Sequence, residues 1–524
     1  MMAVATTRTQ PTTILPLDTQ APHYKWLVAG IVLLAGGTQT FGGTSVNIIV
    51  PRLMAAFGTD LATAQWVVTG FFLTRILVMP LLGWLGAVMG NRNMFAAMMA
   101  GYLVTSIGCG LSTSLSMLIG LRLLQGLIMG TMEGLTAVIL VDVFPERQRG
   151  LALGLRAVGW SAGQIVFYSV GGYLVEQISW RMIFFLGLPP GILATVLGVL
   201  VLPQQRESQG EPVDSLGLLA LGSFLVPLLL GISWSRNSQT ETSTLIWLGL
   251  GALVGGGLFL LRELLTPFPV VNLRLFRMPT FRLICASSFF NNMGLFSALF
   301  MVPIFLQQVL GLSPLQAGLV IVPALVVSGV SGVIMGRLSD LVPPSLVIIT
   351  MMLAGAVIFY LFSSVTAVTA TAVVVGYVIL YRICIMGTHT PITVLAVQTL
   401  EADQVRMGQG LLGVVRSIGG LLGVTITSVF FERQRASYQL EAYHTYDSAS
   451  LAHGDTLREL KRFLHQAGIV GPAAERAALG TIRRQIDIEA VAVGFQSSFL
   501  LACLCFLIGS LPMFYLILRR RWNR

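Results

Sequence analysis

Two short stretches of the sequence, IMGTMEG at residues 128–134 and IMGTHTP at residues 385–391, share four letters and lie in strongly apolar surroundings. The first contains a carboxylate, Glu133, and the second contains His389 and Pro391. A charged side chain at the centre of a bilayer costs about 2.5–3.5 kcal/mol on insertion scales, and it usually faces the interior of a helical bundle. The two copies therefore indicate a duplicated membrane fold with functional groups inside it.

The composition is that of a polytopic membrane protein. Of the 524 residues, 55% are hydrophobic and only 10% are charged, whereas a typical soluble domain has about 25% charged residues. Apolar runs of about 20 residues, the length of a membrane-crossing helix, recur along most of the chain. Because a backbone in lipid must satisfy its own hydrogen bonds, we predict an all-α fold.

Several classes of function are excluded by the absence of their motifs. The net charge of +10 lies mostly at the ends of apolar runs, and no basic patch indicates nucleic-acid binding. The five cysteines lack metal-ligand spacing, so we predict no metal site and no cofactor. Without a Walker motif, an H-E-x-x-H motif or a nucleophile elbow, the sequence indicates neither ATP use nor an enzyme.

The apolar runs predict fourteen membrane spans, whose ends are uncertain by a few residues. They are 26–50, 64–84, 94–112, 117–143, 151–175, 181–202, 215–234, 244–261, 283–309, 315–336, 346–363, 368–398, 408–431 and 490–518. An even number places both termini on one side, and most arginines of the short loops, such as Arg147 and Arg337, fall on that side. The positive-inside rule then makes the termini cytoplasmic.

Further landmarks repeat in the same order along the chain. Arg122 recurs as Arg382, Arg149 as Arg406, and the Arg-x-x-Gly of residues 156–159 as residues 416–419. Both copies start on the same side of the membrane, so the repeats are parallel, which is a transporter architecture with its site between the halves. The repeat distance holds eight spans, so the pair at 215–261 is interpreted as an insertion between two six-helix bundles.

This interpretation divides the chain into five parts. They are a cytoplasmic tail at 1–25, a six-helix bundle at 26–202, two inserted helices with a cytoplasmic connector at 203–282, a second six-helix bundle at 283–518 and a basic cytoplasmic tail at 519–524. We expect an interfacial helix within residues 262–282. The second bundle includes a long outer loop at 432–489, whose mixed charges favour a solvated cap over a docking surface for a periplasmic adaptor.

Several motifs resemble those of the major facilitator superfamily, and in particular its fourteen-span drug:proton antiporter branch. GWLGAVMGNR at 83–92 is similar to the family's cytoplasmic loop motif, RLLQG at 122–126 to its helix-4 motif, and VVRSIGGLLG at 414–423 to its helix 13. The resemblance implies two bundles that rock about a central site in a bacterial cytoplasmic membrane. It also implies that two loops act in conformational switching, through Gly83, Gly90, Arg92, Gly336 and Asp340.

The chain departs from that branch at three places. Gly42 stands where the branch usually has a helix-1 aspartate, and Ala87 stands where the loop motif has its aspartate, which survives only as Asp340 of the second copy. Tyr168 and Ser169 replace the Gly-Pro of the helix-5 signature. These departures favour a second hypothesis, an uncoupled or differently coupled exporter of lipid-like or organic anions.

Glu133 is the only carboxylate near the middle of a predicted span, which makes it the first candidate for a proton carrier. His389 is the second, because histidine titrates near neutral pH. The alternative for Glu133 is a structural ion pair with Arg75 or Arg156. Asp142, near the end of the same span, is interpreted as an interfacial structural residue.

Other polar residues within the predicted spans are candidates for the substrate cavity: Arg75, Arg122, Arg156, Arg382, Thr390, Asn291, Asn292 and Arg416. Arg122, Arg382 and Arg416 match positions of the resembling family, so a bundle-stabilising or gating role is the alternative for these three. Guanidinium groups prefer carboxylate or phosphate partners. We therefore expect an amphipathic substrate that is anionic or zwitterionic.

The leading hypothesis is a secondary transporter that exports such a small molecule by alternating access, driven by protons through Glu133. Its expected partners are the substrate, protons, membrane lipids and a periplasmic adaptor. A hypothesis of another class is a non-transporting membrane scaffold or sensor that binds through its outer loop.

Overall fold

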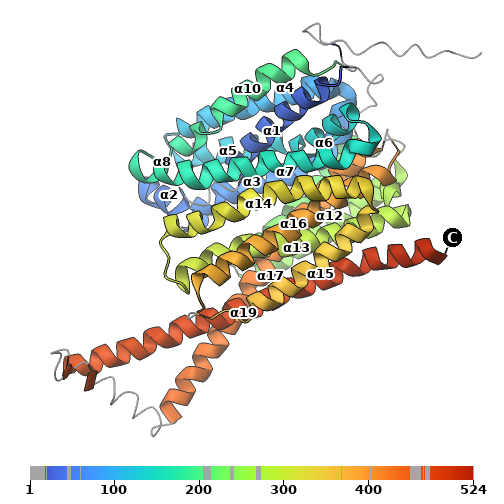
Figure 1. Ribbon diagram of the computed structural model, residues 1–524. Coiled ribbons are helices and arrows are strands. Elements are labelled where there is room, and N and C mark those ends of the chain that lie inside the picture. Colours follow the sequence, from blue (N-terminus) through green and yellow to red (C-terminus); the bar gives the residue numbers. More distant parts are fainter. Residues whose placement is uncertain are drawn as a thin grey trace, which may run out of the picture.

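The structure is a computed structural model. It describes residues 18, 21–43, 49–59, 61–204, 214–235, 241–266, 269, 273–366, 369–401, 404–448, 462–463, 465–466 and 472–522. These residues form a bundle of long helices, and no β-strand occurs among them. Two helices project from the bundle as a long hairpin (Figure 1). The all-α fold class predicted from the sequence is confirmed.

The first half of the chain contributes six crossings. They are α1 (Tyr24–Gly43), α3 (Leu61–Val78), α4 (Leu82–Gly110), α5 (Leu115–Met129) with α6 (Met132–Val143), α7 (Arg149–Val166) with α8 (Gly172–Gln177), and α9 (Met182–Phe185) with α10 (Leu188–Val201). The short helix α2 (Val50–Phe57) lies between α1 and α3.

The chain reverses direction at Gly90, within α4. Along α5, Leu123 and Gly126 contact Gly70 and Phe71 of α3, whereas later residues of α5 contact earlier residues of α4. The packing of α3 on α5 is thus parallel and that of α4 on α5 is antiparallel. Gly90 has φ of 71°, a backbone conformation that glycine adopts without a steric penalty, so this glycine of the loop motif separates two crossings.

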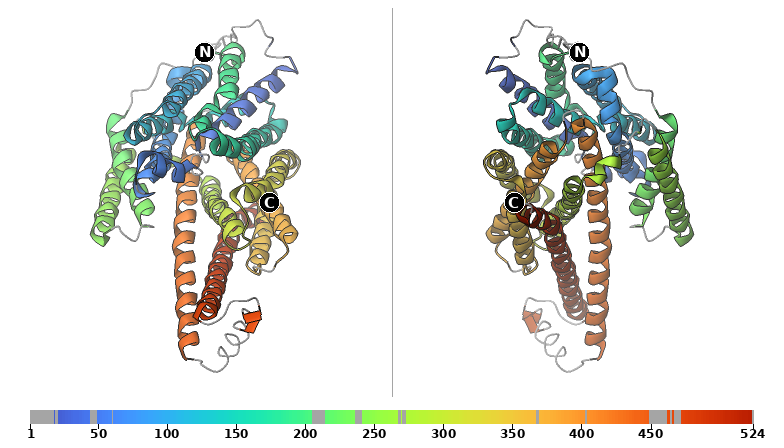
Figure 2. Two further views of the ribbon diagram at one scale, coloured as in Figure 1. Left: turned by 90° about the vertical axis from the view of Figure 1, so that its left-hand side faces the viewer. Right: turned by 90° about the vertical axis from the view of Figure 1, so that its right-hand side faces the viewer.

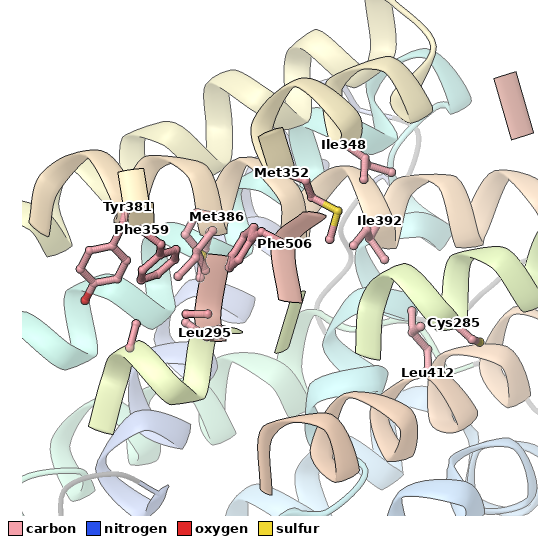
Figure 3. Packing of buried hydrophobic residues seen from close by; sticks show 14 of the residues in the cluster. Cys285, Leu295, Ile348, Met352, Phe359, Tyr381, Met386, Ile392, Leu412 and Phe506 are labelled. Atoms are coloured by element: carbon pink, nitrogen blue, oxygen red, sulfur yellow. The ribbon is translucent and has the colours of Figure 1, made fainter. Parts of the chain in front are cut away.

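The second half contributes six further crossings. They are α13 (Pro279–Gln308), α14 (Pro314–Leu341), α15 (Pro344–Phe362), α16 (Thr371–Thr399), α17 (Val405–Ser448) and α19 (Pro472–Trp522). Their common core is aromatic and aliphatic, with Phe359 between Tyr381 and Phe506, whose ring centres lie 5.7 Å and 5.4 Å from its own, and with Met386 in the same cluster (Figure 3). Helices held by such packing keep their polar faces in a fixed orientation.

Equivalent glycines make the same contacts in the two halves. Gly159 of α7 lies against the backbone of Leu33 of α1, and Gly419 of α17 lies against the backbone of Phe289 of α13. Small residues allow membrane helices to approach closely, so both halves join these two helices in the same way. The duplication predicted from sequence landmarks is therefore visible in the packing.

The helices α11 (Ser215–Trp234) and α12 (Thr242–Leu265) form a hairpin between the halves in sequence. The pair lies at the side of the molecule (Figure 2), where α11 packs against both α3 and α17. Arg262 donates hydrogen bonds of 2.8–3.1 Å to Asp214, which precedes α11, and these bonds hold the pKa of Asp214 below its ordinary value. The insertion thus bridges the boundary between the halves.

Two predicted features differ in the structure. The connector at 262–282 contains the short 3₁₀ helix η5 (Leu273–Arg277), whereas an interfacial helix was expected. Residues 432–448 and 472–489, assigned to an outer loop, are continuous with the membrane helices α17 and α19 and project far from the bundle (Figure 2). Tyr438 and Gln439 donate hydrogen bonds to Glu489 and Asp487, which join the two helices.

The described residues contain 11 helical stretches long and apolar enough to cross a membrane. One of them, Thr63–Gly110, holds the two crossings that meet at Gly90, and α1 and α7 are further crossings of the same bundle. Together they account for the fourteen spans predicted from the sequence. Below, "the terminal side" means the side on which α1 begins and α19 ends.

Candidate functional site

Glu133 lies in the first turn of α6, at the break that separates α5 from α6. Arg75 of α3 donates a hydrogen bond of 3.0 Å from Nη2 to Oε2 of Glu133. Arg156 of α7 donates from Nη1 to the backbone carbonyl of Glu133 at 2.8 Å. Three helices of the first half therefore converge on this residue, and both ion-pair partners proposed from the sequence contact it.

The second half contributes a further arginine to the same carboxylate. Nη1 of Arg416, on α17, lies 3.9 Å from Oε1 of Glu133. The guanidinium of Arg416 is fixed by hydrogen bonds to Ser288 Oγ of α13 at 3.0 Å and to Thr393 Oγ1 of α16 at 2.7 Å. Glu133 is therefore a link between the two halves. We call Arg75, Glu133, Arg156 and Arg416 the central charge cluster.

A small cavity adjoins this cluster. Its walls come from both halves: Met79, Leu82, Gly130, Thr131, Glu133, Gly134, Arg156, Gln409, Gly410, Gly413 and Arg416. Its volume is about 10 Å³, which is room for about one water molecule. The side chain of Glu133 nevertheless keeps 31% of its surface accessible, so a proton can reach it. With this volume, the cavity is too small for a drug-sized molecule.

His389 lies near the central charge cluster without lining its cavity. It is partly buried and within electrostatic reach of Glu133, Arg156 and Arg416. Its backbone carbonyl accepts a hydrogen bond of 3.0 Å from Thr393, which in turn accepts one from Arg416. Its place at the boundary of the halves is compatible with a part in proton transfer.

Three candidates for the substrate cavity lie elsewhere. Thr390 is buried, and its hydroxyl lies beside Gly332 of α14. Asn291 and Asn292 are buried in α13, where Asn292 donates to the carbonyl of Ser288 at 2.9 Å. The positional match of Thr390 to Glu133 therefore did not predict the same surroundings, because Thr390 faces a glycine of a neighbouring helix.

Arg122 and Arg382 occupy equivalent positions in α5 and α16, both wholly buried. Arg122 donates from Nε to the carbonyl of Val67 at 2.9 Å and from Nη1 to Gln125 at 2.6 Å. Its guanidinium also lies 4.2 Å from the centre of the Phe71 ring. Arg122 is thus built into the first half, and it does not line the small cavity.

The two loops predicted to act in switching lie at the boundary of the halves on the terminal side. Gly83 faces Met407 and Gly86 faces the side chain of Arg406, both at the start of α17. Gly336 of α14 faces the backbone of Gly150 of α7. Arg92 is buried within α4, and its neighbour Asn91 donates to Asp142 at 2.9 Å, which agrees with a structural role for Asp142.

Asp340 makes the strongest polar contact between these loops. Its carboxylate accepts hydrogen bonds from the backbone N–H groups of Gly150 at 2.7 Å and Leu151 at 3.0 Å. These groups are the free donors at the start of α7, where the helix dipole also favours a negative charge. Ala87, the equivalent position in the first half, has no carboxylate for the start of α17. The polar contact thus exists in one copy of the loop motif.

A family model described as Major Facilitator Superfamily matches residues 32–424, which is most of the chain. The chain belongs to the Major Facilitator Superfamily. It is therefore a multi-pass membrane transporter and not an enzyme, as the sequence motifs predicted.

Relatives within the superfamily are similar over most of their length. A "Multidrug resistance protein B homolog" of Mycobacterium tuberculosis is 27% identical over 413 residues, which cover 78% of this chain and 76% of the relative. The "Fatty acid resistance protein FarB" of Neisseria gonorrhoeae is 25% identical over 483 residues, which cover 91% of this chain and 92% of the relative.

A solved structure of the superfamily has the same fold. The human organic anion transporter MFSD10 (TETRAN) superimposes with a TM-score of 0.57 at 13% identity, over 94% of this chain and 100% of that chain. At this identity the likeness supports the major facilitator fold of the transporter.

Several residues around the site of this transporter were not singled out in the sequence. Ser288 and Thr393 position Arg416, and Met79, Gln409 and Gly410 close the cavity. Serine, threonine and methionine are common in membrane helices, so their types carried no signal. Only the spatial convergence of α13, α16 and α17 with Met79, the residue that follows α3, identifies them.

We predict that Asp340→Asn destabilises the closed terminal side of the transporter. Losing hydrogen bonds to a charged acceptor costs about 1.5–3 kcal/mol each. The labelling rate of a cysteine placed at Leu153, buried within α7, should therefore rise roughly tenfold or more in a variant without the five native cysteines.

Glu146→Gln is the matched control, because Glu146 forms an exposed pair with Arg149 at 3.5 Å, and such pairs contribute little. Its labelling rate should stay at the parent value. Equal rates in the Asp340 and Glu146 variants would contradict a role for Asp340 in closure.

Proposed function

We propose that the protein is a proton-coupled secondary transporter that exports amphipathic small molecules across the bacterial cytoplasmic membrane, with both termini in the cytoplasm. The observation that carries this proposal is the ion pairing of Glu133 with arginines of both halves. The names of its relatives, a multidrug resistance protein and a fatty acid resistance protein, support export as the activity. The arginine-rich loops on the terminal side support the orientation.

Glu133 couples proton binding to the separation of the halves. Facing Arg75 and Arg416, the carboxylate is ionised in the closed conformation, because opposite charges attract strongly in a medium of low dielectric constant. Protonation neutralises Glu133 and removes its attraction to Arg416. Breaking a fully buried ion pair changes stability by about 3–5 kcal/mol, and solvent reduces this value for Glu133, whose side chain is 31% exposed. Even about 1.4 kcal/mol changes an equilibrium constant tenfold. The pair is therefore strong enough to bias the two access states.

We also propose that the substrate is anionic or zwitterionic. The central charge cluster contains three guanidinium groups and one carboxylate, so its net charge is positive when all four are ionised. A guanidinium released from Glu133 binds carboxylates or phosphates in preference to cations. The fatty acid resistance relative, which matches nearly the whole chain, supports an amphipathic acid as the cargo.

The hairpin of α17 and α19 is proposed as the contact surface for a periplasmic adaptor. Its two helices continue beyond the bundle on the side opposite the end of α19 (Figure 1), and Tyr438 and Gln439 hold them together. A braced helical hairpin presents a defined surface at a distance from the bilayer, which a solvated loop does not.

Glu133→Gln should abolish uphill transport in everted vesicles with an imposed pH gradient. Glutamine keeps the size of the side chain but cannot exchange a proton at physiological pH, so substrate addition should also release no protons. The control is Glu432→Gln, an exposed carboxylate near Arg435 at 3.8 Å, which should transport as the parent does. Normal uphill transport by Glu133→Gln would leave the membrane potential, rather than proton exchange, as the driving force for an anion.

Matched amphipaths that differ only in head-group charge test the substrate class. We expect dodecanoate to be transported at least tenfold more efficiently, in kcat/KM, than dodecylamine. Competition against a fluorescent amphipath in proteoliposomes measures both. A clear preference for the amine would contradict an anionic cargo while leaving proton coupling intact.

Deletion of residues 435–485 separates transport from partner binding. The membrane core of each bundle does not depend on this hairpin, so the deleted protein should retain transport in proteoliposomes, and only export that requires a periplasmic partner should be lost. Complete loss of transport by a folded deletion protein would favour a binding scaffold or a direct role of the hairpin in transport.

A further inference from the structure

Two nitrogens of the Arg382 guanidinium have no acceptor among the described residues. Arg382 retains 1% of its surface exposed, and its Nε and Nη1 atoms are buried without a hydrogen-bond partner in the part of the chain that the structure describes. Its guanidinium lies 5.7 Å from the centre of the Tyr381 ring. A buried charge without a partner is strongly destabilising, so a functional reason for this arginine is required.

The first half shows what a structural arginine needs at this position. Arg122 donates to the carbonyl of Val67 and to the amide oxygen of Gln125, three residues further along the same helix. Three residues after Arg382 the chain has Ile385, which is apolar and wholly buried. The second half thus keeps the charge and lacks the amide oxygen that accepts a hydrogen bond from Nη1 in the first half.

Asn291 shows the same asymmetry. Both polar atoms of its side chain are buried and unpartnered within the described residues, and α13, which carries it, packs directly on α16. In the first half the equivalent position on α1 is Ala35, as judged from the matching contacts of Gly159 with Leu33 and of Gly419 with Phe289. The second half therefore holds two polar groups with unused hydrogen-bonding capacity.

Arg382 lies at the boundary between the halves. Tyr168, from the π-helical segment η4 (Phe167–Gly171) of the first half, is within electrostatic reach of it and packs against the core clusters of both halves. Arg382 precedes His389 by two helical turns on α16, so both project from nearly the same face and are roughly 10 Å apart along the axis. Arg382 is thus farther from the terminal side than the central charge cluster.

We propose that Arg382 is the binding site for the anionic head group of the exported amphipath, separate from the proton site at Glu133. This assignment rests on the proposed function and adds a location to it. A carboxylate supplies the two acceptors that the guanidinium lacks and can bind it in a bidentate manner. When the halves separate at Tyr168, the head group gains access to Arg382, and the uncompensated charge is neutralised by the cargo.

The separation of the two sites divides their tasks. Glu133 and Arg416 change their pairing when a proton binds, whereas Arg382 recognises charge on the substrate. Substitutions at Arg382 therefore alter which amphipaths are transported without altering the dependence of transport on the pH gradient.

A substitution that copies the first half tests this assignment and leaves Arg382 in place. Ile385→Gln places an amide three residues after Arg382, as Gln125 stands after Arg122, and so offers the guanidinium a competing partner. Ile385→Met is the matched control, since methionine has a similar shape without an amide. Both are made in the full-length protein.

The probes are 11-(dansylamino)undecanoic acid and its primary amide, which differ only in head-group charge. Fluorescence titration of purified protein gives Kd, and transport into proteoliposomes gives KM. We expect Ile385→Gln to raise Kd and KM for the acid by roughly tenfold, the size of one charged hydrogen bond, and to leave the amide unchanged. Ile385→Met should match the parent for both probes.

Arg382→Gln should abolish the preference for the acid over the amide, and Arg382→Lys should restore part of it. Equal affinities of Ile385→Gln and Ile385→Met for the acid would overturn the assignment, as would an equal loss of acid and amide binding in Arg382→Gln. If the parent protein transports neither probe nor any other amphipath, the proposed function itself fails, whereas unchanged selectivity with intact proton-coupled transport refutes only the role of Arg382.

Discussion

The attraction between Glu133 and arginines from opposite halves is the interaction on which the rest of this transporter depends. Arg75 anchors the carboxylate within the first half at 3.0 Å, and Arg416 approaches it from the second half at 3.9 Å. In a medium of low dielectric constant, separating such a pair leaves each charge without its partner, which costs free energy. In the proposed mechanism, one proton on Glu133 removes this attraction and shifts the balance from joined towards separated halves.

Close packing makes that small change effective. Glycines such as Gly154 and Gly332 bring α7 and α14 together along the boundary of the halves, and Asp340 closes it on the terminal side through the first N–H groups of α7. Packed interfaces of this kind have few alternative arrangements, so a local change in charge is converted into a movement of whole helices. The cavity beside Glu133 holds about one water molecule, which is consistent with a closed member of this pair of states.

The residues proposed to act in closure and in substrate binding lie at positions where the two halves differ. Asp340 has a carboxylate where Ala87 has none, Ile385 stands where the first half has Gln125, and Asn291 stands where it has Ala35. Duplication supplies a symmetric scaffold of paired helices, with Gly159 and Gly419 in equivalent contacts. Loss of symmetry at single positions then provides the terminal-side contact of Asp340 and leaves two nitrogens of Arg382 without an acceptor among the described residues.

The sequence by itself determined the helical membrane fold and the fourteen crossings, and it indicated the duplication and singled out Glu133 as a candidate, because hydropathy and the rarity of buried charge are local properties of the chain. It also placed Arg75 and Arg156 beside Glu133 as alternatives, and the structure uses both. It did not determine that Arg416 reaches across from the second half, that Thr390 faces Gly332, or that residues 432–448 and 472–489 continue the membrane helices. These contacts depend on the rotation of each helix about its axis and on which helices become neighbours. Both the rotation and the choice of neighbours are determined by the packing of side chains that are distant in sequence.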